Sequence, residues 1–333
     1  MFDVSPAKQR LRLEEMRKSI PGVHHVTAIC GDPQANIDFY TSILGIRLVK
    51  LTVNFDDPHS YHIYYGDNRG NPGTILTFFA WPGAPKGWRG TGQVTAVSFS
   101  APVHSLDYWK ARLNDHSVKT ENVPGRFGNG VITFNDPDGL PLELVANPGD
   151  EREGWTRGPV PAEFAIKGFD GITLSEDGYE QTASLLKDTM GFHFVGEENN
   201  RYRYRAAESQ PASTVDILCL PGAGMGQVSV GTVHHVAWRT PDDEQQKEWR
   251  EELVNLRLNV TPVIDRRYFH SIYFREPGRV LFEIATEPPG FTIDEPLESL
   301  GTTLKLPPWL EPLRTNLENE LPSLKLPKPQ ASH

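Results

Sequence analysis

The sequence predicts an α+β protein made of four βαβββ modules, paired into two curved-sheet halves that are open and barrel-like. Three observations predict this fold class. Strand-like and helix-like patterns alternate in the same order four times, two of the copies begin with the same His-His-Val motif, and every copy ends in a β-rich run. Repetition of one supersecondary unit indicates a fold built by stacking or pairing copies of that unit. A chain of 333 residues is long enough for two such halves.

The first and fourth modules begin with the apolar-rich strand patterns 24–29 and 234–239. A polar turn follows each strand, and then apolar residues recur at helical spacing. In the first module Asp32 can cap the helix and Pro33 can occupy its first turn. The apolar face of that helix consists of Ile37, Tyr40, Ile43 and Leu44, and that of the fourth module consists of Trp249, Leu253 and Leu256.

The second and third modules repeat this order over residues 93–119 and 168–195. Each module then closes with a β-rich run, and in three of the four a Pro- and Gly-containing turn precedes it. These closing runs are 74–79, 140–145, 214–220 and 280–285. The repeated unit is therefore a strand, a helix and about three further strands.

The expected boundaries divide the chain into an N-terminal extension, four modules and a Pro-rich C-terminal tail. We expect modules 1 and 4 to enclose a metal site and modules 2 and 3 to form a metal-free half. Residues 81–90 form a linker or a mobile lid, and the tail packs in extended form over the surface or frays. The ranges are 1–20 for the extension, 21–85, 92–150, 162–222 and 230–290 for modules 1 to 4, and 304–333 for the tail.

Three side chains are candidate metal ligands. Because successive side chains of a strand point to opposite faces, His25 shares a face with Val23 and Thr27, and His235 occupies the same position in the fourth module. Glu283 lies in a closing strand with no other charge, where a carboxylate needs a partner or an ion. Two imidazoles and one carboxylate leave one side of an octahedral Fe(II) open, although Zn, Mn and Ni also accept these ligands.

The alternative is that these residues are hydrogen-bonded structural groups, which are more common in strands than metal ligands. The equivalent placement of His25 and His235 in two repeats favours the metal site. Glu143 matches Glu283 in position, but its module has no first-strand histidine. We therefore interpret Glu143 as a relic or a structural carboxylate.

The motifs resemble the vicinal-oxygen-chelate superfamily (glyoxalase, bleomycin resistance protein and dioxygenase), and within it the hydroquinone-specific ring-cleaving dioxygenases. The resemblance covers roughly residues 20–305. It implies Fe(II) or Mn(II) held by His25, His235 and Glu283, with Tyr273 and Arg266 in the substrate pocket. Some members have glycine where this chain has Arg267, which leaves the substrate detail open. The matching segments are 22–27, 61–67, 70–74, 233–237, 265–275 and 277–283.

The position of Tyr273 depends on a hairpin loop. A three-residue loop at 277–279 places Tyr273 opposite Glu283 on the metal face, whereas a four-residue loop places it opposite Phe282. The alternative interpretation is that Tyr273 is an ordinary aromatic residue of a strand, with no role in the site. In the proposed chemistry, Tyr273 donates or accepts a hydrogen bond at the substrate oxygen, and Arg266 stabilises an anionic ring or intermediate.

Four further residues are candidates for the substrate pocket or for contacts behind the ligands. Thr27 shares the face of His25, whereas His24 and His234 point away from their neighbouring ligands and are expected to make supporting hydrogen bonds. His62 lies in a Tyr-rich strand and is either a pocket residue or a core histidine. The remaining histidines show no partner pattern and are expected at the surface: His59, His104, His116, His193, His270 and His333.

The predicted function is a metal-dependent dioxygenase that cleaves substituted hydroquinones with O2. The alternatives are a glyoxalase-type isomerase, a catechol extradiol dioxygenase and a non-catalytic sequestering protein.

A net charge of −10 argues against nucleic acid as a partner. Two cysteines, Cys30 and Cys219, favour a reducing cytoplasm, and neither a signal peptide nor an apolar run of membrane-spanning length is expected. The oligomeric state stays open, and a homo-oligomer is compatible with the sequence.

Overall fold

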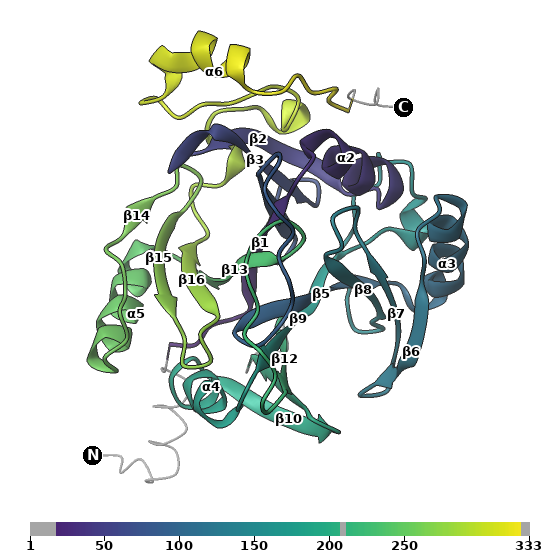
Figure 1. Cartoon of the computed structure of the whole chain (residues 1–333), viewed down its shortest axis with the longest axis vertical. Coiled ribbons are helices and arrows are strands. Elements are labelled where there is room, and N and C mark those ends of the chain that lie inside the picture. Colours follow the sequence, from purple (N-terminus) through teal and green to yellow (C-terminus); the bar gives the residue numbers. More distant parts are fainter. Residues whose placement is uncertain (1–17, 207–210, 328–333) are drawn as a thin grey trace, which may run out of the picture.

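The computed structural model describes residues 18–206 and 211–327. Most of the expected N-terminal extension and the end of the tail, including His333, lie outside the described residues. The described strands form two eight-stranded sheets (Figure 1). The predicted fold class, α+β with βαβββ modules paired into two curved-sheet halves, is therefore confirmed.

Each module contributes one strand, one helix and three strands. Helices α2 and α4 each continue into a π-helical turn, at Phe39–Ile43 and Leu185–Thr189. The elements in chain order are β1 (Val23–Cys30), α2 (Pro33–Asp38), β2 (Arg47–Asn54), β3 (Asp57–Gly66), β4 (Ile75–Ala80), β5 (Gln93–Ala101), α3 (Leu106–Asp115), β6 (Glu121–Arg126), β7 (Asn129–Asn135), β8 (Pro141–Ala146), β9 (Gly168–Glu176), α4 (Glu180–Ser184), β10 (Phe192–Glu198), β11 (Arg201–Ala206), β12 (Thr214–Cys219), β13 (Val233–Thr240), α5 (Asp243–Asn255), β14 (Ile264–Asp265), β15 (His270–Arg275) and β16 (Leu281–Thr286).

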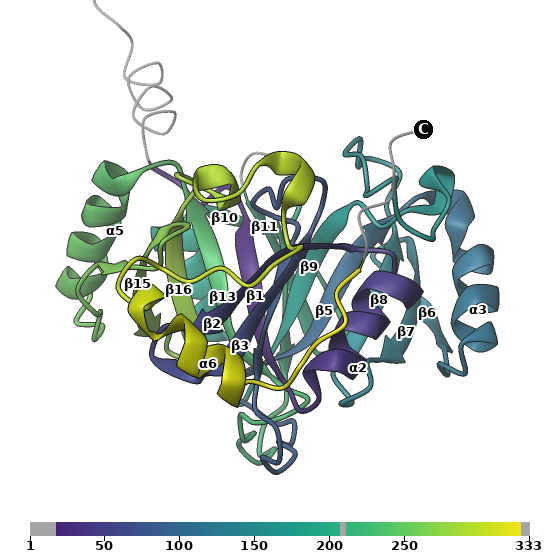
Figure 2. The same ribbon diagram turned by 90° about the horizontal axis from the view of Figure 1, so that it is seen from above.

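Strands from the two ends of the chain share one sheet, in the order β14-β15-β16-β13-β1-β4-β3-β2. The second sheet has the order β10-β11-β12-β9-β5-β8-β7-β6. In each sheet two modules meet through an antiparallel pair of first strands, β1 with β13 and β5 with β9. We call the first sheet with its helices the outer half, because it combines the first and last modules, and the second the inner half. Helices α5 and α3 lie at opposite ends of the molecule (Figure 2).

The strand register identifies equivalent positions in the four modules. In each module the first strand pairs in parallel with the last, and the paired positions are Thr27 with Thr77, Ser98 with Glu143, Thr173 with Asp216, and Ala237 with Glu283. Two residues before the first member of each pair stand His25, Ala96, Gly171 and His235. The outer half therefore has histidine at both of these positions, and the inner half has alanine and glycine.

Helix ends and buried faces follow the predicted signals. Asp32 caps α2 by accepting hydrogen bonds from two backbone N–H groups, and Asp242 caps α5 in the same way with one. Trp249 and Leu253 on α5 are fully buried, as the helical spacing predicts. Each large apolar side chain buried in this way stabilises the fold by roughly 1.5–3 kcal/mol. Leu256 lies just beyond the helix and is exposed, because the helix ends at Asn255.

The C-terminal segment packs across the outer half. Leu304 forms a bridge with Leu51 on β2, and the hydroxyl of Tyr61 on β3 donates a hydrogen bond to the Pro322 carbonyl. The segment also contains helix α6 (Arg314–Glu320), which was not predicted and which Arg314 supports through ion pairs with Glu311 and Glu318. No helix in residues 18–206 or 211–327 has the length and apolar character needed to cross a membrane.

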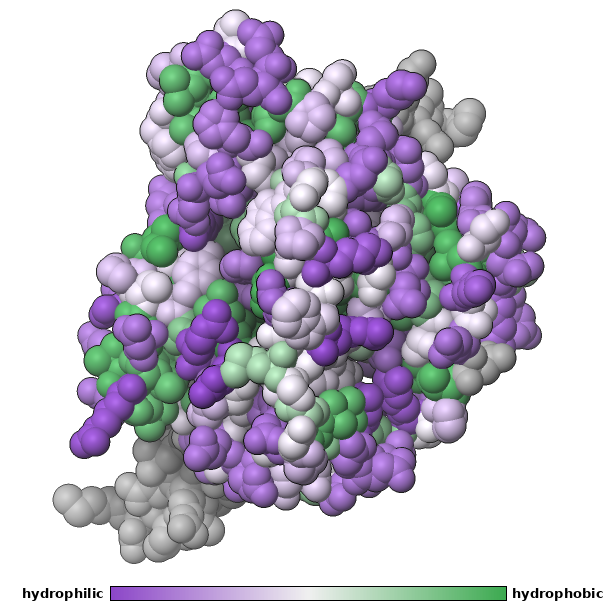
Figure 3. Space-filling model, in the orientation of Figure 1, coloured by the Kyte–Doolittle hydropathy of each residue, from purple (hydrophilic) through white to green (hydrophobic). Residues whose placement is uncertain are grey.

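The linker after the first module runs beside the linker before the fourth. Isolated bridges join Lys86 to Val230 and Thr91 to Met225. Trp88 in this linker is 57% exposed. In the view of Figure 3, hydrophilic side chains cover most of the surface, and apolar residues form small separate areas, as is usual for folded domains.

Candidate metal centre

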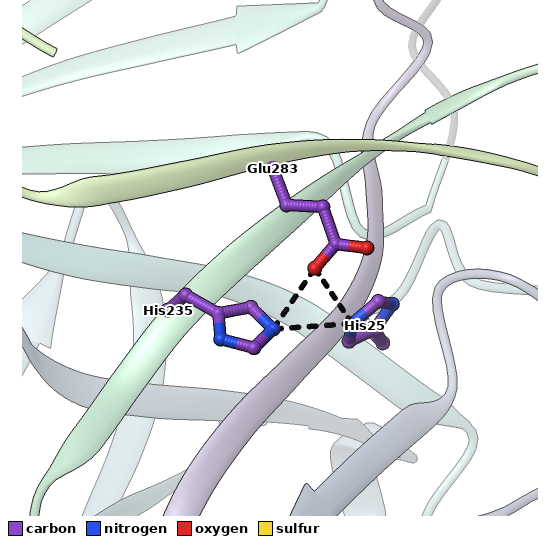
Figure 4. A group of neighbouring side chains, drawn as sticks. All are labelled: His25, His235 and Glu283. Carbon is purple, nitrogen blue, oxygen red and sulfur yellow. Dashed lines mark hydrogen bonds and ion pairs between the residues drawn. The ribbon is translucent and has the colours of Figure 1, made fainter. Parts of the chain in front are cut away.

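His25, His235 and Glu283 converge from three adjacent strands of the outer half (Figure 4). Nε2 of His235 lies 2.9 Å from Oε2 of Glu283, and Nε2 of His25 lies 3.3 Å from the same oxygen. The two Nε2 atoms are 3.4 Å apart. His25 lies more than 200 positions before the other two residues, and the three side chains meet because β1 pairs with β13 and β13 pairs with β16.

The spacing of these three donor atoms suits one transition-metal ion. Ligands at about 2.1 Å from a metal lie about 3.0 Å apart in an octahedron and about 3.4 Å apart in a tetrahedron. The observed separations of 2.9, 3.3 and 3.4 Å cover this range. The geometry therefore fits a divalent metal without selecting the coordination number.

The surroundings of Glu283 also suit a cation site. This side chain is fully buried; its Oε1 accepts a hydrogen bond from Ser271, and its Oε2 has no hydrogen-bond partner among the described residues. Burial alone would raise the pKa of Glu283, but the interactions with His25 and His235 outweigh burial and hold that pKa well below its ordinary value. Burial lowers the pKa of His235. A metal ion binds an ionised carboxylate and neutral imidazoles, and its positive charge would take the place of the ring proton that otherwise attracts Glu283.

His24 and His234 support the two histidine candidates. Nδ1 of His24 lies 2.9 Å from Nδ1 of His25, and Nδ1 of His234 lies 2.8 Å from Nδ1 of His235. A neutral imidazole that binds a metal through Nε2 carries its proton on Nδ1 and donates it outward. Burial lowers the pKa of His234 to about 3 and that of His24 well below its ordinary value, so both rings are neutral and can accept this proton at Nδ1. The two pairs therefore orient both ligand rings in the same way.

Tyr273 and Arg266 lie next to the three candidate ligands. The loop at 277–279 has three residues, with Arg279 in the left-handed region (φ +76°), and the ladder pairs Tyr273 with Glu283. Nε of Arg266 donates to the Tyr273 hydroxyl at 3.2 Å, and its Nη1 lies 2.8 Å from Oδ2 of Asp56. Burial, followed by the charge of Glu283, raises the pKa of Tyr273, so its hydroxyl stays protonated.

Thr27 and His62 lie on the other side of the centre. Thr27 pairs with His235 across β1 and β13, and its hydroxyl accepts a hydrogen bond from Thr77 at 2.9 Å. His62 contacts the Thr77 hydroxyl through Nε2 and the Tyr64 hydroxyl through Nδ1. The structure therefore brings all nine of the predicted site residues into one region of the outer half.

Several neighbours of this centre were not predicted. Ser271, Thr77, Tyr64 and Asp56 each bond to a predicted residue. Ser271 shares a strand face with Tyr273, so alternation along β15 was a signal for it. Thr77 occupies the position equivalent to Glu283, but only an alignment of the repeats reveals this.

Two other groups of predicted residues lie away from the metal candidates. His59, His104, His116 and His193 are exposed as expected, whereas His270 is partly buried and paired with Asp243. Arg267 has φ +69°, a conformation that glycine adopts without strain. In the inner half Glu143 is a salt-bridged carboxylate, with Arg126 at 2.6 Å.

Comparison with known proteins agrees with this fold. Residues 22–144 match the model of the glyoxalase/bleomycin resistance protein/dioxygenase superfamily. The chain is 48% identical to "Putative ring-cleaving dioxygenase MhqO" of Bacillus subtilis over 92% of this chain and 97% of that protein. It is 34% identical to the chlorohydroquinone/hydroquinone 1,2-dioxygenase of Sphingobium indicum, over 91% and 96%.

A solved structure extends this similarity to three dimensions. A crystal structure described as a putative dioxygenase from Bacillus subtilis superposes with a TM-score of 0.90 at 47% identity, covering 93% of this chain and 99% of that one. The relatives are matched over nearly their whole length, so the similarity includes both halves of the molecule. The chain belongs to the glyoxalase/bleomycin resistance protein/dioxygenase superfamily, and both of its halves are similar to proteins named as ring-cleaving dioxygenases.

Proposed function

We propose that this protein is a metal-dependent dioxygenase that opens the aromatic ring of hydroquinones with O2. The observation that carries the proposal is the buried group of His25, His235 and Glu283, whose Glu283 Oε2 has no hydrogen-bond partner among the described residues. The similarity to the chlorohydroquinone/hydroquinone 1,2-dioxygenase of Sphingobium indicum supports the same substrate class. One ring C–C bond breaks and both atoms of O2 enter the product, so no external reductant is required.

The metal we propose is Fe(II), with Mn(II) as the second candidate. His25, His235 and Glu283 would hold this ion, which would supply Lewis acidity toward an aromatic substrate and the redox chemistry that activates O2. His24 and His234 keep the ligand rings in one tautomer, and Ser271 fixes one oxygen of Glu283. These contacts leave Nε2 of both histidines and Oε2 of Glu283 as the ligand atoms.

The roles of Tyr273 and Arg266 follow from their positions. The Tyr273 hydroxyl accepts from Arg266 and can donate its own proton to a substrate oxygen. Because its pKa is raised, Tyr273 acts as a hydrogen-bond donor at neutral pH. The Arg266 guanidinium stays charged and stabilises negative charge that develops on the ring during cleavage.

Three other functions use the same scaffold differently. A glyoxalase-type isomerase usually has four protein ligands, and the group found in the described residues has three, with the hydroxyl of Thr77 at the fourth equivalent position. A sequestering protein would leave Glu283 buried without an ion, which is unfavourable. A catechol extradiol dioxygenase differs only in its aromatic substrate.

Oxygen uptake separates these functions. The protein should be loaded anaerobically with Fe(II), mixed with a panel of substituted hydroquinones and catechols, and followed with an oxygen electrode. We expect stoichiometric oxygen consumption with a hydroquinone. Uptake with catechols alone would indicate the extradiol enzyme, and no uptake with any aromatic substrate would refute the proposal.

Location and assembly are part of the same proposal. Two free cysteines and the acidic charge support a cytoplasmic protein that acts on small molecules and not on nucleic acid. Gel filtration with light scattering would show whether it forms a homo-oligomer.

A further inference from the structure

Four side chains form a continuous hydrogen-bonded chain that ends beside the metal centre. The Tyr64 hydroxyl lies 2.9 Å from Nδ1 of His62, and Nε2 of His62 lies 2.8 Å from the Thr77 hydroxyl. The Thr77 hydroxyl donates to the Thr27 hydroxyl at 2.9 Å. Thr27 lies opposite His235 in the β1–β13 ladder and shares a strand face with His25.

The direction of every bond in this chain follows from its last bond. A hydroxyl has one proton, and Thr77 gives its proton to Thr27, so Thr77 must accept from His62. His62 then carries its proton on Nε2. Burial keeps this ring neutral by lowering its pKa, so its Nδ1 is bare and accepts from the Tyr64 hydroxyl. All the donors therefore point from Tyr64 toward Thr27.

The Thr27 hydroxyl is the free end of this chain. It is fully buried and accepts from Thr77, and its own proton has no acceptor within residues 18–206 and 211–327. Hydrogen bonds aligned in one direction polarise one another and strengthen the last donor. A buried donor without an acceptor is costly unless a ligand supplies one.

We propose that Tyr64, His62 and Thr77 are positioning residues that fix the Thr27 hydroxyl as a hydrogen-bond donor to an anionic oxygen of the bound substrate. This inference rests on the proposed function and deepens it, because it assigns a second donor to the substrate on the side of the centre away from Tyr273. Thr27 touches the substrate, whereas the other three residues act only through it.

The equivalent position in the inner half shows a different use. There Nη1 of Arg201 donates to the Thr173 hydroxyl at 2.8 Å and to Oδ2 of Asp216 at 3.0 Å. Thr173 is the counterpart of Thr27, and Asp216 is the counterpart of Thr77. Thr173→Val therefore removes a buried threonine hydroxyl from the same sheet position and leaves the four hydrogen-bonded residues of the outer half unchanged. It is the matched control.

The first experiment tests the direction of the bonds without any substrate. Proton–nitrogen NMR of the full-length protein with ¹⁵N-labelled histidine, metal-free and loaded with diamagnetic Zn(II), reports the tautomer of each ring, and His62→Gln identifies the His62 signals. We expect a neutral His62 protonated on Nε2. A ring protonated on Nδ1, or on both nitrogens, would overturn the proposal.

The second experiment measures turnover of the Fe(II)-loaded enzyme with a hydroquinone. Thr77→Val should lower kcat/KM by about tenfold, the effect expected for one hydrogen bond to a charged group. It should also move the acidic limb of the pH profile up by about one unit, because the anionic substrate loses that stabilisation. Thr77→Ser keeps the hydroxyl and should restore both values, and Thr173→Val should leave them unchanged.

A double-variant cycle tests whether Thr77 acts through Thr27. In a Thr27→Val background, the Thr77→Val change should have no further effect on kcat/KM. Independent, additive losses would overturn the proposal, as would a Thr77→Val enzyme with wild-type kinetics and full metal content. Failure of the wild-type enzyme to turn over any hydroquinone would instead reject the proposed function, and the tautomer measurement would still decide the direction of the chain.

Discussion

The outer and inner halves share one architecture but differ in the side chains that surround the equivalent buried carboxylates. In the outer half Glu283 faces two histidines, and its Oε2 has no hydrogen-bond partner among the described residues. In the inner half its counterpart Glu143 is bound by Arg126 and Ser98, each at 2.6 Å. Asp216, at the equivalent position of the third module, is bound by Arg203 and Arg201.

The difference shows that neighbouring residues decide how a carboxylate at this sheet position is neutralised. Arginines neutralise Glu143 and Asp216 within the protein itself. The outer half provides neutral imidazoles, which leave the negative charge for a metal ion. Alanine and glycine at the two histidine positions complete the inner arrangement, and a side chain at Gly171 would meet the Thr214 carbonyl oxygen at 2.3 Å from its Cβ.

The largest expected effect comes from the two equivalent glutamates. Glu283→Gln should weaken metal binding by more than about a hundredfold, which exceeds the usual loss for an outer-shell contact, and should abolish oxygen uptake. Glu143→Gln should keep stoichiometric metal and activity. Metal analysis after dialysis and isothermal titration would measure this, and metal loss in both variants would break the comparison.

The second effect concerns the arginines of the two halves. Arg266→Lys keeps the charge but loses the Nε bond to Tyr273, and we expect kcat to fall by about a hundredfold, as for loss of one charge-stabilising donor. Arg203→Lys, which loses the two-point contact with Asp216, should lower thermal stability and leave kcat unchanged. Equal losses of kcat would show that the inner pair also contributes to turnover.

The third effect separates the two serines that bind these glutamates. Ser271→Ala removes the hydrogen bond to Glu283 and should weaken metal binding by about tenfold, the lower end for an outer-shell contact. Ser98→Ala removes the equivalent bond to Glu143 and should not change the affinity. Titration of the metal against a competing chelator measures both, and an unchanged affinity in Ser271→Ala would contradict the role given to Ser271.

The smallest expected effect is on stability and concerns the contact between the halves. Glu176 of β9 and Glu276 beyond β15 both lie within 2.7 Å of the Thr182 hydroxyl, which can donate to only one of them. Burial, followed by the charge of Glu276, raises the pKa of Glu176 to about 9. The contribution of this group is fully present below its ordinary unfolded pKa and is lost as the pH rises toward about 9.

Melting temperatures between pH 6 and pH 9.5 would test this. The wild-type protein should lose stability as the pH rises, and Glu176→Gln should flatten that dependence because its amide carries no titrating proton. At a second contact between the halves, the Tyr40 hydroxyl donates to Asp136, and burial raises the pKa of Asp136 only to about 6. Asp136→Asn should therefore change the melting temperature between pH 6 and pH 9.5 less than Glu176→Gln does. A wild-type melting temperature that is constant over this range would contradict the assignment.

Much of the site could be predicted because strand alternation and repetition are local properties. His25 and His235 occupy equal places in two copies of one motif, and Glu283 is the single charge in a buried strand. Register could not be predicted, because it depends on one loop residue: Arg279 adopts φ +76°, which closes a three-residue loop and places Tyr273 opposite Glu283. Ser271 shares a strand face with Tyr273 and Thr77 is equivalent to Glu283, but both were missed because a threonine or serine in a strand is not by itself a sign of a partner.

The sequence by itself determined the module, its fourfold repetition, and the residue types that can bind a metal. These depend on neighbours a few positions apart, where side-chain direction follows from backbone geometry. Only the tertiary structure decided that β1 pairs with β13, which brings residues 25 and 235 within 3.4 Å at Nε2, and that arginines neutralise the inner carboxylates. Such contacts arise from the burial of whole sheets, and the free energy of that burial is shared among residues far apart in the chain.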